Sequence, residues 1–139
     1  MGKNINGTQI NQSVTIVEKA GAAITDARNL IVKYDNNGDV VLATAGTDFP
    51  LGIAIIEAGY NDVSGLESGK VAKGDDVDIQ IKDIGYVIAS EDITKGTAVA
   101  AATGGKAAAA TSGDFVLGIA LADAAADGYL RIAICRYKG

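Results

Sequence analysis

One eight-residue phrase occurs twice in this sequence, as DFPLGIAI at residues 48–55 and as DFVLGIAL at residues 114–121. The two copies agree at six positions and contain both phenylalanines of the 139-residue chain. Self-similarity of this kind is the signature of a repeated structural unit. We therefore expect one β domain over residues 21–139, built from two similar halves at about residues 22–82 and 84–137.

The segments around each phrase share a layout. ATAG precedes the first copy and ATSG the second, and further upstream two apolar runs flank Asn37-Gly38 or Gly104-Gly105. These dipeptides are typical of tight hairpins. After the phrase, GDDVDIQI and DGYLRIAI alternate apolar and polar residues, as half-buried strands do. The expected strands lie at residues 14–18, 29–34, 39–43, 51–57, 77–82, 84–89, 97–102, 106–110, 116–122 and 129–137.

The alanine tracts at residues 100–102 and 107–110 favour helix by intrinsic propensity. Their counterparts in the first half are β-branched, and two glycines separate them, so we interpret them as strands. A short helix is expected at residues 122–126. The sequence therefore predicts an all-β fold, a small glycine- and alanine-rich barrel or sandwich.

The repeated phrase is apolar on both faces, which indicates a strand buried on both sides. A glycine inside such a strand marks a bulge or a close backbone approach, because it is otherwise a net cost. We expect the phenylalanine rings to close the end of the barrel or sandwich. The residues of this predicted core repeat are Phe49, Leu51, Gly52, Ile53, Phe115, Leu117, Gly118 and Ile119.

Several kinds of chemistry are disfavoured by the composition. The chain has no histidine, which removes the commonest general base and metal ligand. Its one cysteine, Cys135, cannot form an internal disulfide. The YDNNGD segment at residues 34–39 resembles a calcium loop only superficially, because its glycine precedes the third acidic position. We expect no catalytic residue, metal or cofactor, and thus no enzyme.

The formal charge of −5 and the scattered lysines and arginines offer no basic face for nucleic acid. No apolar run is long enough for a signal peptide or a membrane span. A soluble protein made in the cytoplasm of its host is the expectation.

The first twenty residues are polar and rich in asparagine, and they precede the repeat. Such an arm is either disordered by itself or pairs with another chain by strand addition. The contact residues predicted for the second case are Ile5, Ile10, Val14 and Ile16. A second polar, glycine-bearing segment at residues 59–69 is interpreted as an inserted loop.

The combination of this arm with ATAGTDFPLGIAI, GDDVDIQI and GTAVAAATGGKAAAATSGDFVLGIAL resembles the capsid cement or head decoration proteins of tailed bacteriophages. The resemblance covers about residues 20–134. It implies a tulip-like β fold of the lambda decoration type that binds the outside of an assembled phage head. The implied partners are the major capsid protein and further copies of the chain, in a homotrimer, and the implied location is the outer surface of the virion. The function that follows is stabilisation of the head by bridging capsid subunits.

Two alternatives remain open. A minor head fibre or spike subunit would use the arm to anchor a projection, and it predicts a fibrous or coiled-coil extension that this sequence does not show. A small β barrel that binds a ligand predicts a concave aromatic or polar cluster, whereas the five tyrosines are dispersed along the chain.

Overall fold

The computed structural model describes residues 15–55 and 69–139. Ile5, Ile10 and Val14 of the predicted arm, and nearly all of the predicted loop at 59–69, lie outside these residues.

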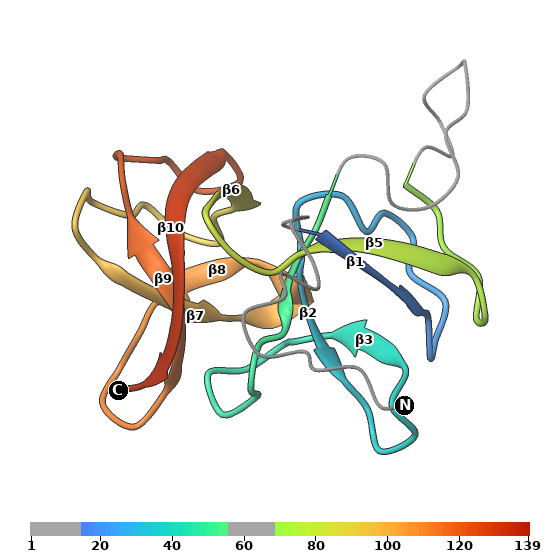
Figure 1. Cartoon of the computed structure of the whole chain (residues 1–139). Coiled ribbons are helices and arrows are strands. Elements are labelled where there is room, and N and C mark those ends of the chain that lie inside the picture. Colours follow the sequence, from blue (N-terminus) through green and yellow to red (C-terminus); the bar gives the residue numbers. More distant parts are fainter. Residues whose placement is uncertain (1–14, 56–68) are drawn as a thin grey trace, which may run out of the picture.

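The described chain forms two five-stranded antiparallel sheets (Figure 1), which confirms the all-β prediction. The strands of the first half are β1 Thr15–Lys19, β2 Ile31–Tyr34, β3 Val40–Leu42, β4 Gly52–Ala54 and β5 Asp76–Gln80. Those of the second half are β6 Ile84–Ile88, β7 Ala98–Ala101, β8 Ala107–Ala109, β9 Phe115–Ala120 and β10 Tyr129–Lys138.

The two sheets have the same topology. Their orders are β1-β5-β4-β2-β3 and β6-β10-β9-β7-β8, so in each half the first strand lies beside the fifth. A parallel bridge then links the first strand's end to the third strand, Ala20 to Val40 in one half and Ala89 to Ala107 in the other. Each sheet therefore curls towards closure, and fewer of its edge groups remain without a partner.

The alanine tracts are strands, as their counterparts in the first half indicated. Between them, Thr103–Gly105 form a short 3-10 turn in which Gly104 and Gly105 have φ values of 76° and 80°. Glycine adopts this left-handed region at little cost, so the turn reverses the chain between β7 and β8. The two strands pair directly, with Ala100 opposite Ala108.

The helix predicted at residues 122–126 is wrong. This segment is extended at Ala124, whose N–H donates to the carbonyl of Ile93 and whose carbonyl accepts from the Ile93 N–H, at 2.9 and 2.8 Å. The corresponding bridge in the first half joins Ile24 to Val71. Pairing with a distant segment thus overrides the helix propensity of the alanines.

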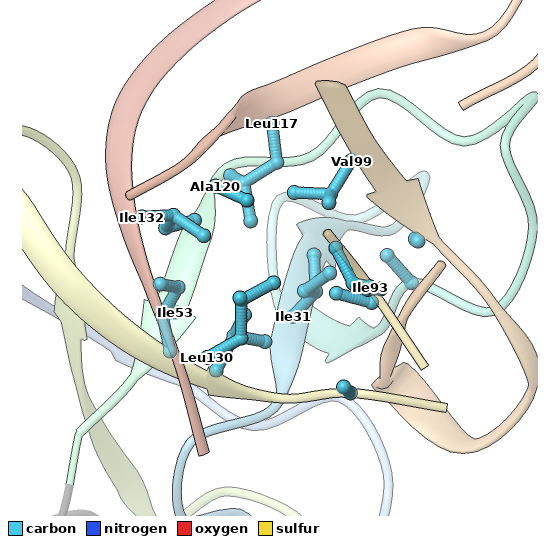
Figure 2. Close-up of a cluster of buried hydrophobic side chains, with 13 residues drawn as sticks. Ile31, Ile53, Ile93, Val99, Leu117, Ala120, Leu130 and Ile132 are labelled. Carbon is cyan, nitrogen blue, oxygen red and sulfur yellow. The ribbon is translucent and has the colours of Figure 1, made fainter. Parts of the chain in front are cut away.

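The central strands β2 and β4 are buried on both faces. Val32 and Ala54 belong to a cluster inside the first half, whereas Ile31 and Ile53 belong to a second cluster. Figure 2 shows Ile31 and Ile53 lying among Leu130, Ile132 and other side chains of the second half. The two halves therefore share one of their hydrophobic cores, which explains why the repeated phrase is apolar at successive positions.

Candidate functional site: the surface at the junction of the two halves

The two phenylalanines of the repeated phrase meet at the surface. The ring of Phe49 stacks on that of Phe115, with centroids 5.2 Å apart and planes 9° from parallel. Phe49 is 60% exposed and Phe115 is half-buried, so the rings lie outside the buried core, at the surface. The ammonium group of Lys138 lies 5.3 Å from the centre of the Phe115 ring.

The rings meet because the segments that precede them are packed together. The N–H of Phe115 donates to the carbonyl of Gly46 at 2.8 Å. A Cβ atom on Gly46 would lie 2.3–2.5 Å from the carboxylate of Asp114, so a larger residue here would have to displace that side chain. This close backbone approach places the start of one phrase against the start of the other.

The aspartates that open the two phrases perform equivalent tasks. Asp48 accepts the N–H of Thr44 at 3.0 Å, and Asp114 accepts the N–H of Thr111 at 2.9 Å. Asp48 also forms an ion pair with Lys33 at 2.8 Å. The Lys33 ammonium donates to the Asp48 carboxylate and lowers the pKa of that carboxyl group below its ordinary value, and the Thr44 N–H acts in the same direction.

The remaining residues of the predicted core repeat lie along β4 and β9 or at their ends. Ile53 and Leu117 are fully buried, whereas Leu51 and Ile119 are partly buried. Gly52 and Gly118 are buried where these strands pass close to the last strand of their own half. Ile16, predicted in the contact arm, lies in β1 opposite Ile79 and packs against the first-half core.

Beside the phenylalanine pair the surface is hollowed by about 500 Å³. Tyr34, Phe49 and Leu51 line the hollow from the first half, and Arg136 closes it from β10. The guanidinium of Arg136 donates to the carbonyl of Leu51 at 2.9 Å. The Tyr34 hydroxyl donates to the carboxylate of Glu18, and this bond raises the pKa of Tyr34.

A second surface that the sequence analysis did not identify lies on the outward side of β6 and β10. Tyr86 and Tyr129 are 50% and 66% exposed there, and Ile84 is exposed beside them. The sequence does indicate this surface, because apolar positions alternate strictly along both strands and the residues between buried positions must face outward. This surface provides a natural comparison for the phenylalanine junction.

Neither surface has the groups of a catalytic centre. Within residues 15–55 and 69–139, no cluster of three or more histidine, cysteine or acidic side chains could hold a metal. The carboxylate of Asp35 in the segment that resembles a calcium loop accepts the N–H groups of Asn37 and Asp39, at 2.8 and 3.0 Å, and so caps a turn. The described chain also contains no helix long and apolar enough to cross a membrane.

The described chain thus consists of two matching all-β halves with exposed aromatic rings and cations at their junction. The chain matches the XM1 gp53 minor capsid protein family over residues 1–134 and belongs to that family. It is therefore a member of a family of phage capsid components.

A solved structure shares the fold over nearly the whole chain. It is the N-terminal base of the head fibre gp8.5 of bacteriophage phi29, with a TM-score of 0.62 and 22% sequence identity. The match covers 91% of this chain and 97% of the other. No curated protein sequence matches the chain.

These comparisons support the part of the prediction that describes a phage-head structural protein. The likeness to the fibre base, at 22% identity, shows that the two chains share a fold.

Proposed function

We propose that this protein is the base of a head fibre or similar projection, attached to the outer surface of the phage head. The observation that carries the proposal is the extent of the structural likeness: it spans 97% of a head fibre base and 91% of this chain. A fragment shared between unrelated proteins would cover only part of each. Membership of a minor capsid family supports the same location.

The physical character of the chain suits a point of attachment. Both sheets are closed in part by the bridges at Ala20 and Ala89, and the halves share a core, so the body resists deformation under load. The net charge of −5 suits a surface that faces solvent rather than DNA. The partners we propose are the major capsid protein and two further copies of this chain, because a trimer would multiply weak contacts through effective concentration.

A separate question is whether the protein also stabilises the assembled head. A protein that binds the assembled shell and not its free subunits stabilises the shell by mass action. A fibre base can do this weakly, whereas a cement protein must do it strongly. The two functions therefore differ in how strongly the protein stabilises the shell, and this stabilisation can be measured on the same particles.

The test is binding of the purified protein to mature heads that lack it, followed by cryo-electron microscopy. We expect density for the β body at discrete outer sites with full occupancy at saturation. Absence of binding, or density inside the shell or at the tail, would contradict the proposal. Thermal release of DNA from the same heads, with and without the protein, then separates the two functions. A fibre base leaves the release temperature nearly unchanged, and a cement protein raises it.

A further inference from the structure

We propose that the free edge of β10, together with the hollow beside Phe49, is the face that docks onto the capsid shell. Its occupant is an extended segment of the shell protein in which an apolar side chain lies next to a carboxylate. This inference rests on the proposed function, because the partner is the shell to which the base is attached.

The first observation is an unpaired strand edge. β6 pairs with β10 only from Tyr129 to Ala133, whereas β10 continues to Lys138. The N–H of Ile134 still donates to the carbonyl of Asp83, at 2.8 Å. Beyond this bond, the described part of the chain provides no backbone partner on that side of β10. Among the described residues, nothing pairs with the edge of residues 135–138, and an open edge is a template for an added strand.

The second observation is the hollow that adjoins this edge. Arg136 belongs to both, because its backbone is in the open stretch of β10 and its side chain lines the hollow. The volume of about 500 Å³ falls in the range of small binding pockets. Phe49 and Tyr34 expose 60% and 44% of their surfaces there. An apolar side chain from an added strand would cover both rings.

The third observation is charge. Arg136 and Lys138 have no carboxylate partner in residues 15–55 and 69–139, although the chain as a whole carries −5. Lys33 and Asp48 neutralise each other in the hollow. The face thus offers two uncompensated cations beside aromatic rings, and arginine and aromatic residues dominate binding energy at protein interfaces. A carboxylate on the partner complements it.

Charge also argues against a two-fold contact with a second copy of this chain, although not against the three-fold contacts of a trimer. A two-fold contact through this face would bring the Arg136 and Lys138 side chains of both copies together, and like charges that face each other at an interface weaken binding. Capsid association, in contrast, follows from the family to which the chain belongs. The shell protein is therefore the partner to which the inference commits.

The experiment compares head binding by two variants of this face with two matched variants of the tyrosine surface. Phe49→Ser is paired with Tyr129→Ser, because both rings are about equally exposed, at 60% and 66%. Arg136→Glu is paired with Arg131→Glu, because both are exposed arginines on β10. Circular dichroism and thermal melts establish that each variant folds, and Arg136→Lys tests for partial rescue.

We expect Phe49→Ser and Arg136→Glu to weaken binding to heads about tenfold or more, which is the effect of losing one interface hot spot. Tyr129→Ser and Arg131→Glu should bind like the wild type. Normal binding by both junction variants, or loss of binding only in the control pair, overturns the inference while the proposed function stands. Junction variants that bind heads normally but change the oligomeric mass identify a second copy as the occupant and also overturn it. Failure of the wild type to bind heads removes the proposed function itself.

Discussion

Gly52 and Gly118 occupy the same position in the two halves. Each lies against a backbone carbonyl of the fifth strand of its half, which is β5 for Gly52 and β10 for Gly118. A Cβ atom would lie 2.2 Å from the oxygen of Gln80 at the first site and 2.3 Å from that of Ala133 at the second. The contact is with backbone on both occasions, so no side chain can move aside. The repeated phrase therefore contains its glycine for the same steric reason twice.

Replacing either glycine by alanine should lower the free energy of unfolding by about 3 kcal/mol, since overpacking of a buried strand displaces backbone. Gly74→Ala is the matched control. Gly74 has a φ of 91° and nothing within 4 Å of the added Cβ, so only backbone strain of about 1–2 kcal/mol opposes the change. Urea denaturation of the three variants measures the difference. Equal losses at Gly52, Gly118 and Gly74 would contradict the steric explanation.

The stacked rings of Phe49 and Phe115 should contribute to the cohesion of the junction. A double-mutant cycle with Phe49→Ala and Phe115→Ala should give a coupling energy of about 1 kcal/mol, as measured for aromatic pairs. The expected sign is that the double variant loses less stability than the sum of the single variants. Additive losses would show that the rings only lie near each other.

The ion pair of Lys33 and Asp48 makes stability depend on pH in a defined direction. An unfolded aspartate titrates near pH 3.9, and Lys33 lowers the pKa of Asp48 in the folded chain. The stabilisation is therefore complete above about pH 5 and is lost as the pH falls through the lower, folded pKa. Asp48→Asn should cost about 1 kcal/mol at pH 7, and this deficit should shrink as the solution is acidified below pH 4.

The control for this pH effect is Asp127→Asn. Asp127 pairs with Lys106 at 2.7 Å, but its side chain is 73% exposed, so the pair should contribute less than about 0.5 kcal/mol at any pH. Chemical unfolding at a series of pH values measures both variants. A deficit for Asp48→Asn that is constant down to pH 2 would refute the assignment.

The shared core predicts that the two halves unfold together as one β domain. Ile53→Ala, which removes a fully buried side chain at the contact between the halves, should cost about 3 kcal/mol. Amide hydrogen exchange should show equal losses of protection in the most protected amides of β2 and β9. Destabilisation confined to the first half would show that the halves are independent domains.

The N-terminal arm remains a prediction from sequence. Deletion of residues 1–12 removes Ile5 and Ile10 and should weaken either head binding or self-association, if these residues contact a partner chain. Sedimentation and the head-binding assay measure the two effects. Unchanged results in both would dispose of the contact function.

The fold was predictable because its signals are local. Alternation in β5 and β10, and the glycine pairs between hairpin strands, depend on neighbours in sequence and identify strands whatever surrounds them. The alanines of β7 and β8 were assigned only through their counterparts in the other half. The helix prediction for residues 122–126 was wrong because the pairing partner of this segment, Ile93, is about thirty positions away. Helix propensity carries no information about such a distant partner.

The candidate site was less predictable for a related reason. The repeat singled out Phe49 and Phe115, and the sequence analysis placed their rings at the end of the barrel or sandwich, since large apolar residues are usually buried. Their exposure depends on how one half sits against the other, which no pattern within a half encodes. No sequence pattern singled out Arg136, because its contact with the Leu51 carbonyl joins two strands that are far apart in the sequence.

The pairing of the first strand of each half with its last has a consequence for synthesis on the ribosome. β1 cannot pair with β5 until residue 80 has emerged from the exit tunnel, and β6 cannot pair with β10 until β10 has emerged. When the first sheet has formed, Ile31 and Ile53 still face the place that Leu130 and Ile132 will later fill. The nascent chain thus carries a bare apolar face until residues 130–132 have been made, and this interval is when chaperones or premature aggregation would compete for it.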